Sequence, residues 1–277
     1  MRKSTGVELF LRAAFGRGYP RVVGAQRELS WLFFDIVIPL ITMSASVFLY
    51  KALQADPAYI GFVVVGAALA TYWLNVLWMM ASQLYWDKQA GLLEIYIMSP
   101  ASMMAILLGM GVGGLYMSTL RAGSIAIAGT LLFNVQMDGS QWGASALVFF
   151  VTMVALYGLG MVLSSVFLMW GREAWQVSLA LQEPVFFMSG MNFPLNQLFN
   201  SVQAITTLVS AVIPVGLGLD ALRQLLFPGK IEGVLPWGWE LGALAVMGVV
   251  FVTVAYLMLK RMEWLAKVEA RLSLRWQ

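Results

Sequence analysis

The sequence predicts an all-α membrane protein with six transmembrane helices, forming a single domain over residues 1–277. Hydrophobic residues make up 60% of the chain and charged residues only 11%, against about 25% in soluble domains. The apolar segments are long and lack strict alternation, which favours helices over barrel strands. The chain has no Cys and no His, which excludes disulfides, thiolate chemistry and imidazole-based metal or proton sites.

Residues 1–30 predict helices at the membrane surface. They carry six Lys and Arg, with apolar residues at helical spacing between them, as in amphipathic helices that lie in the interface. We expect residues 16–20, GRGYP, to break this helix, and a second short helix to begin at Arg21. The alternative is a solvated basic tail. No cleavable signal peptide is expected, because these residues lack an apolar core.

The six expected spans are each apolar and about as long as a bilayer crossing requires. They cover residues 31–50, 60–84, 103–133, 144–169, 175–191 and 239–259. The third is long enough to predict a tilt or a break. Its Gly109 and Gly113 form a pair of small residues four apart, which predicts the close approach of another helix.

The distribution of Lys and Arg predicts the orientation. Thirteen of the seventeen fall on one set of connecting segments and three on the other, while Arg121 lies within a span. The positive-inside rule therefore predicts that both termini are cytoplasmic in the plasma (inner) membrane. The tail, residues 260–277, alternates cations with apolar and aromatic residues and predicts a surface helix that contacts membrane lipids, not nucleic acid.

Residues 192–238 do not fit a simple outer loop. They are mostly apolar, yet a full crossing would place the C-terminal cations outside. We therefore expect a re-entrant hairpin of two short helices in the outer leaflet, which must be shielded by protein or water. It follows a turn that reads Ser-Gly-Met-Asn-Phe-Pro over residues 189–194.

Residues 85–100, YWDKQAGLLEIYIMSP, form a short polar island between two spans on the expected cytoplasmic side. Three charged residues lie in it: Asp87, Lys88 and Glu94. Two apolar pairs repeat at four residues: Leu92 with Tyr96, and Leu93 with Ile97. This spacing predicts a short helix that Pro100 ends. The alternative is an ordinary cytosolic loop.

Two stretches carry a family resemblance. An acid at Asp87, then Gly91, Glu94 and Ser99-Pro100, resembles the coupling helix of ABC-2-type transporter permeases, although a Glu often begins that pattern. The turn at residues 189–194, followed by Pro214 and the run Leu-Asp-Ala-Leu-Arg at 219–223, is similar to the end of the fifth span and the outer hairpin of that family. The resemblance covers nearly the whole chain.

The resemblance implies a permease subunit of an ABC exporter. Residues 85–100 would then be the coupling segment, docked on a separate ATPase subunit that binds ATP and Mg. The implied contacts are Asp87, Lys88, Gly91, Leu92, Leu93, Glu94 and Tyr96. A second copy or a paralogue would complete the path, and the implied outer gate turn comprises Ser189, Gly190, Phe193 and Pro194. The implied cargo is a hydrophobic or amphiphilic drug, antibiotic, lipid or lipid-linked glycan.

The chain itself carries no recognisable catalytic machinery. It has no GxxxxGK[ST] motif and no Ser/His/Asp constellation, so we expect it not to be an enzyme. Three ionisable residues in the spans are candidates for the translocation path or for a buried polar network: Asp35, Arg121 and Glu183. A structural hydrogen bond is the expected role of Asp35. Glu183 either pairs with Arg121 or a neighbouring subunit, or lines the path.

Two other classes of function stay open. An ion-coupled secondary transporter would use Glu183 and Arg121 for a proton or counter-ion, but we find no internal repeat of the kind that such folds often contain. A membrane-embedded lipid-modifying enzyme would need a catalytic group, which the absence of His and Cys makes hard to supply.

Overall fold

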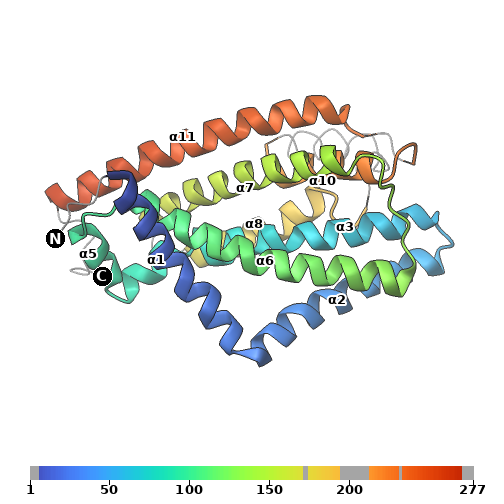
Figure 1. Cartoon of the computed structure of the whole chain (residues 1–277), viewed down its shortest axis with the longest axis horizontal. Coiled ribbons are helices and arrows are strands. Elements are labelled where there is room, and N and C mark those ends of the chain that lie inside the picture. The colour runs from blue at the N-terminus through green and yellow to red at the C-terminus, as the bar shows by residue number, and fades with distance from the viewer. Residues whose placement is uncertain (1–5, 171–173, 194–211, 231–232, 270–277) are drawn as a thin grey trace.

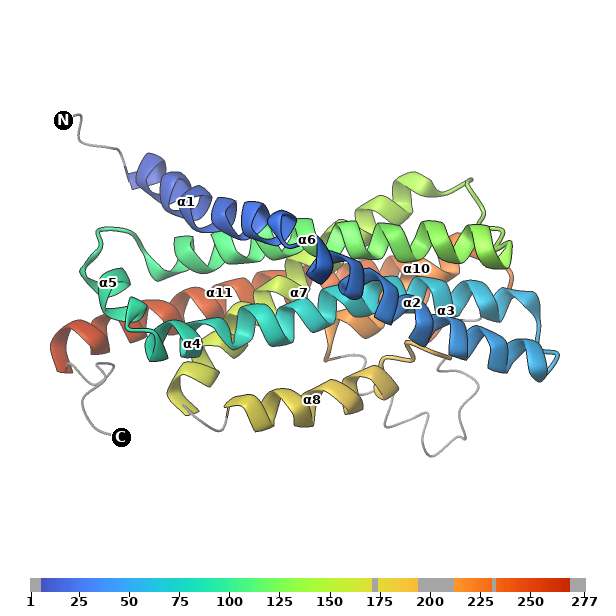
Figure 2. The same cartoon turned by 90° about the horizontal axis from the view of Figure 1, so that it is seen from below.

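The computed structural model describes residues 6–170, 174–193, 212–230 and 233–269. Within these ranges it contains helices and no strands, which confirms the predicted all-α class. Long helices run side by side along the long axis of the molecule (Figure 1). The start of α1, the short helix α5 and the end of α11 lie at one end, and α10 lies towards the other (Figures 1 and 2).

The first two helices form a V. Helix α1 covers Gly6–Arg27 and α2 covers Leu29–Ala52, and the chain bends sharply between them at Glu28 (Figure 1). The expected break at residues 16–20 is wrong, because α1 continues through Pro20 as one helix. Its contact with α6, described below, explains why it stays continuous.

The second predicted span is the most buried of the candidate spans. It consists of α3 (Pro57–Leu74), a π-helix, η1 (Asn75–Ala81), and α4 (Gln83–Gln89). The Asp56 side chain accepts a hydrogen bond of 2.8 Å from the Ala58 N–H and caps α3. Most side chains of this stretch are buried. The helical stretch ends at Gln89 and not at residue 84, so Asp87 lies on a helix and not in a loop.

Helices α5 and α6 agree closely with their predicted bounds. Helix α5 covers Leu92–Met98, two residues before Pro100, and follows Gly91, whose φ is +73°. Helix α6 covers Met103–Phe133, as predicted. The Ser102 side chain caps its first turn. Asn134, with a φ of 54°, ends it.

Small residues bring α1 and α6 into backbone contact, which confirms the predicted role of Gly109 and Gly113. A Cβ on Gly109 would lie 2.2 Å from the Ala14 carbonyl oxygen, and one on Gly113 would lie 3.0 Å from that of Gly18. Any larger residue at Gly109 would force α1 away from α6. This close packing holds the middle of α1 along α6.

Four further helices complete the described chain: α7 (Trp142–Trp170), α8 (Ala174–Met188), α10 (Pro214–Leu226) and α11 (Trp237–Glu269). The span expected at residues 175–191 is the 15-residue helix α8, about 22 Å long at 1.5 Å per residue. A separate surface helix from residue 260 is wrong, because α11 continues unbroken to Glu269. Residues 194–211 and 270–277 lie outside the described residues.

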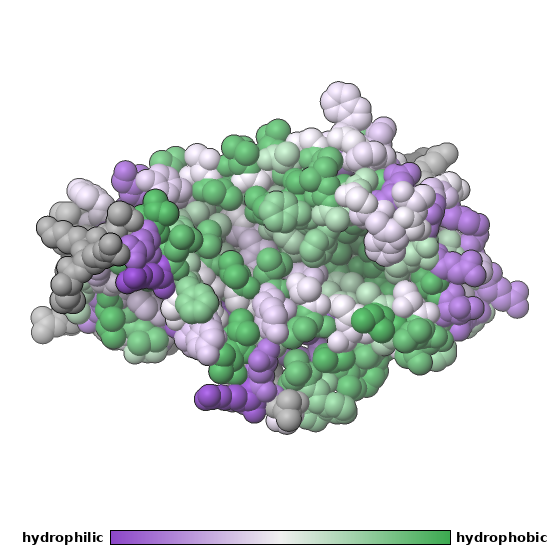
Figure 3. Space-filling model, in the orientation of Figure 1, coloured by the Kyte–Doolittle hydropathy of each residue, from purple (hydrophilic) through white to green (hydrophobic). Residues whose placement is uncertain are grey.

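Among the described residues, five helical stretches are long and apolar enough to cross a bilayer: Leu32–Ala52, Pro57–Gln89, Met103–Phe133, Trp142–Leu168 and Trp237–Leu265. Helices α2 and α11 leave most of their apolar side chains exposed. Apolar residues cover the middle of the face in Figure 3, and hydrophilic residues gather at both ends and at the corner of the V. These features indicate a multi-pass membrane protein.

Candidate functional site

Asp87 ties three helices together at the α5 end of the molecule. The Arg17 Nη2 atom donates to both of its carboxylate oxygens, at 3.0 and 2.9 Å. Gln83 donates to one oxygen at 2.9 Å and the Tyr96 hydroxyl to the other at 3.2 Å. Asp87 is only 3% exposed. Its carboxylate therefore faces the interior, which differs from the surface contact implied by the resemblance.

Tyr96 lies in the same network. Burial, and then the charge of Asp87, raise the pKa of Tyr96 to about 12. The Arg17 guanidinium lies 5.6 Å from the centre of its ring, within the range of a cation–π contact. The phenol thus stays neutral and donates to Asp87 across the physiological pH range.

The outer surface of α5 is apolar. Leu92, Ile95 and Met98 are 36%, 58% and 81% exposed, and Glu94 is exposed beside them. Leu93, an expected contact, is instead buried in the core. Lys88 is partly buried, and Gly91 forms the left-handed turn before α5. Ile95 and Met98 were not among the expected contacts, because that prediction followed the pairs at four residues and not the exposed face.

The C-terminal end of α11 also lies near α5. The Glu263 carboxylate accepts a short hydrogen bond from the Met103 N–H, the first residue of α6. The connection between α5 and α6 is therefore fastened to α11. A force applied at α5 would reach α1 through Asp87 and α11 through Glu263.

Arg121 pairs with Asp35. An ion pair of 2.5 Å joins them between α6 and α2, and both side chains are mostly buried. Two expected path residues therefore neutralise each other, and the proposed pairing of Arg121 with Glu183 is wrong. Helix periodicity alone does not show which spans are neighbours, so the sequence left this partner open.

Glu183 lies exposed on α8, on the side of the molecule seen at the bottom of Figure 2. Its carboxylate accepts a hydrogen bond of 2.9 Å from Gln182. Gln182 in turn accepts one of 2.6 Å from the Trp78 indole N–H on η1. Glu183 is thus outward-facing within a single chain, and no ion pair is recorded for it among the described residues.

Arg21 lies between two cavities, each of about 360 Å³. One opens towards Arg121 and Asp35, the other towards Arg17. Arg21 donates to the Met79 carbonyl oxygen on η1 at 3.3 Å, and burial lowers its pKa. A partly buried guanidinium with one carbonyl partner is a ready site for a polar or anionic group.

Arg223 fixes the expected outer turn to the helix bundle. Its side chain is 2% exposed, and it donates to four backbone carbonyls: Gly190 at 2.7 Å, Phe193 at 3.4 Å, Phe62 at 2.9 Å and Met191 at 3.0 Å. Ser189 is buried nearby, Gly190 has a φ of 63°, and Pro194 lies outside the described residues. The orientation count had treated Arg223 as an outer cation.

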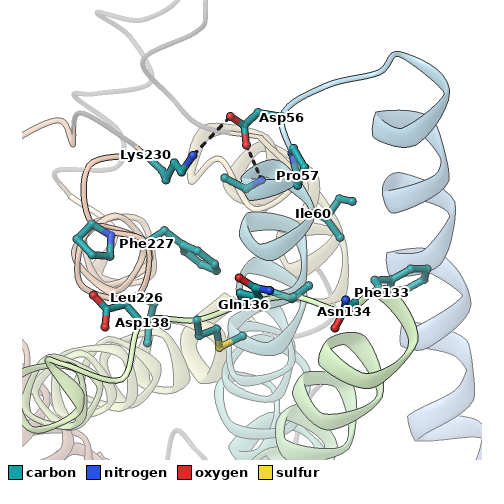
Figure 4. Close-up of a pocket in the computed structure, with 14 residues that line it drawn as sticks. Asp56, Pro57, Ile60, Phe133, Asn134, Gln136, Asp138, Leu226, Phe227 and Lys230 are labelled. Carbon is teal, nitrogen blue, oxygen red and sulfur yellow. Dashed lines mark hydrogen bonds and ion pairs between the residues drawn. The ribbon is translucent and has the colours of Figure 1, made fainter.

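A further cavity of about 700 Å³ lies at the α10 end (Figure 4). Asp56 and Lys230 face each other at its edge, 3.9 Å apart. Gln136 and Asp138 line it from the connection between α6 and α7, and Phe227 from the end of α10. The described part of the molecule is therefore hollowed both beside Arg21 and at the α10 end, by cavities that the apolar pattern did not reveal.

Among the described residues, no group of three or more His, Cys, Asp and Glu is placed to hold a metal ion. The residues that sequence reasoning missed are chiefly arginines: Arg17, Arg21 and Arg223. Their one available signal was position, since Arg17 and Arg21 lie in the basic helix α1 and Arg223 lies in the mostly apolar stretch that forms α10. No known protein family matches the chain, and no curated protein matches it.

Proposed function

We propose that the chain is the permease subunit of an ATP-driven exporter of the ABC-2 type. The observation that carries this proposal is the surface of α5. Leu92, Ile95 and Met98 are exposed next to Glu94 on a seven-residue helix between two long apolar helices. An apolar patch with one acid at its centre suits the groove of a partner protein better than it suits water.

The connections behind α5 support a role in transmission. Asp87 links α4 to α1, and Glu263 links α11 to the start of α6. In this proposal Asp87 positions α5 and does not itself contact the partner. ATP and Mg are bound by two separate ATPase subunits, whose closure moves α5 and, through these links, the spans.

The proposal includes a second copy of the chain, or a paralogue, and six spans in each. Helix α8 would be the remaining span, with both termini on the cytoplasmic side of the plasma membrane. The exposed carboxyl of Glu183 supports a neighbour or a water-filled path beside α8, because a charge facing lipid is costly. Of the implied hydrophobic or amphiphilic cargoes, the cavities around Arg21 support the amphiphilic class, because apolar side chains line them beside a guanidinium.

The test is co-purification with a candidate ATPase subunit, followed by ATP turnover and export in proteoliposomes. Ile95→Asp should abolish complex formation, because it places a charge in an apolar contact, whereas the control Ile95→Val should retain it. Glu94→Ala should keep the complex and reduce export. If Ile95→Asp forms a normal complex and exports normally, α5 is not the docking site and the proposal fails.

An ion-coupled secondary transporter is the second candidate, favoured by the exposed carboxyl of Glu183 on an apolar helix. The same experiment separates the two. Transport by the purified chain alone, driven by an ion gradient and lost in Glu183→Gln, would support the second candidate. Transport that requires the ATPase supports the first.

A further inference from the structure

Two carboxyl groups from different helices meet at the α10 end of the molecule. Asp220 lies on α10 and Glu240 in the first turn of α11. They are 8% and 0% exposed. A single nitrogen, Nε2 of Gln224, lies 3.4 Å from an oxygen of Asp220 and 3.1 Å from one of Glu240, so the two carboxyl groups are neighbours that share one amide donor.

The available donors serve the two groups unequally. Oδ2 of Asp220 accepts a hydrogen bond of 2.7 Å from the Val234 N–H in addition to its contact with Gln224. Oε2 of Glu240 has the Gln224 contact, but Oε1 is buried and has no N–H or O–H donor. A buried, ionised oxygen with no donor is costly. A proton on Glu240 would remove this charge.

Among the described residues, no Lys or Arg forms an ion pair with either carboxyl, although the charges of Arg223 and Asp220 attract each other. Arg223, next to Asp220 in space, directs its terminal nitrogens to the carbonyls of Phe62 and of residues 190–193. Lys230 faces Asp56. Helices α3 and α7, which pack on α10, contain no charged residue, and residues 194–211 contain none in their sequence. Glu232 lies outside the described residues.

The tyrosines of the helices packed on α10 are engaged elsewhere. The hydroxyl of Tyr72 contacts Thr119, that of Tyr157 contacts Asn75, and the ring of Tyr59 stacks on Tyr50. Two neighbouring, buried carboxyl groups that share one amide donor and form no ion pair do not both ionise, since like charges that close hold one proton on the pair.

We propose that Asp220 and Glu240 form a proton-binding site that fastens α10 to α11. Glu240 carries the proton and donates through Oε1 to Asp220, which is ionised and held by Val234 and Gln224. When the proton leaves to the solvent, two adjacent carboxylates remain and repel. The contact between the cavity-lining end of α10 and the last long helix then loosens. This site acts in the chain alone and does not depend on the proposed transport function.

The test uses the purified full chain in detergent, with the unfolding equilibrium measured across about pH 5 to pH 9. A separated glutamate has a pKa of about 4.3, so the folded chain binds one more proton than the unfolded chain over this range. The folding constant of the wild type should therefore fall by up to about tenfold per pH unit relative to Glu240→Gln. That variant keeps the shape and supplies a permanent donor.

The control is Glu183→Gln, an exposed acid on α8, which should keep the wild-type slope. Asp220→Asn should lose the slope as Glu240→Gln does. As a measurement that needs no variant, unfolding the wild type in weakly buffered solution at about pH 7 should release a proton, detected with an indicator dye.

Equal slopes in the wild type and Glu240→Gln, or unfolding without proton release, would overturn the proposal. Stabilisation of the wild type, and not of the variants, by added sodium or calcium at fixed pH would assign the pair to a metal cation and would also overturn it. If neither variant folds, the proton count on the wild type decides.

Discussion

Arg17 holds Asp87 with hydrogen bonds of 3.0 and 2.9 Å from a single guanidinium nitrogen. The pair joins the middle of α1 to the last turn of α4, just before the turn into α5. Asp87 is almost fully buried and Arg17 is about two-thirds buried. Helix α1 and the helix that leads into the proposed docking helix α5 are thus linked by one charged contact.

Asp87→Asn should weaken this link. Asparagine keeps the size of the side chain but loses the charge and one acceptor, and a hydrogen bond to a charged group contributes about 2 kcal/mol. We expect a clear fall in melting temperature and faster proteolysis of α1. The control is Glu94→Gln, which removes an exposed acid on α5 nearby. Equal melting temperatures for the two variants would contradict a structural role for Asp87.

Tyr96 gives a prediction that depends on pH. Its raised pKa means that the fold favours the neutral phenol. Its stabilising contribution should therefore be complete below the unfolded pKa of about 10 and should be lost as the pH rises towards about 12. The melting temperatures of the wild type and Tyr96→Phe should differ at neutral pH and converge in strong alkali. A difference in melting temperature that stays constant with pH would show that the contribution of Tyr96 does not depend on its protonation.

The α1–α6 contact predicts opposite effects at two glycines of one helix. Gly109→Ala places a Cβ 2.2 Å from the Ala14 carbonyl oxygen, an overlap that should cost about 1–3 kcal/mol. Gly123→Ala meets nothing within 4 Å and should stabilise α6 by about 0.5 kcal/mol. Thermal unfolding of both variants is the measurement. A neutral Gly109→Ala would mean that α1 moves away from α6 without loss.

Arg223→Met should be strongly destabilising. It removes one buried side chain on which four backbone carbonyls depend, and losing those partners should cost at least about 3 kcal/mol. Arg223→Lys should recover only part of this, since one ammonium cannot reach all four acceptors. Lys230→Met, at an exposed cation nearby, is the matched control. Hydrogen exchange at residues 189–193 should rise in Arg223→Met and not in the control.

Much of the fold was predictable, because the length of the apolar segments and the residues that end helices determine it. The bounds of α6 and the end of α5 before Pro100 followed from composition and one proline. The continuity of α1 through Pro20 could not be predicted in this way. It depends on close packing against α6, which is distant in the sequence. The ends of α4 and α11 could not be predicted for a similar reason, since both helices continue past the apolar segment into polar sequence.

The candidate site was less predictable than the fold. Asp35 and Arg121 were predicted as charges within spans and Asp87 as a contact of the partner subunit, but their partners within the chain depend on which helices are neighbours. Arg223 was counted as a solvent-exposed cation because a count of charges carries no information on burial. Asp220 and Glu240 are twenty residues apart and on different helices, so no local spacing marked them as a pair.

The π-helix between α3 and α4 has a consequence for angular phase. In such a segment each N–H reaches one residue further back than in an α-helix, so everything after Ala81 is delayed by one residue, about 100° of rotation around the helix axis. This delay helps set the direction in which Asp87 faces α1. Removing one residue from Asn75–Ala81 would restore the α-helical phase and turn Asp87 away from Arg17. The π-helical segment thus fixes the rotational orientation of the α5 end relative to the rest of the bundle.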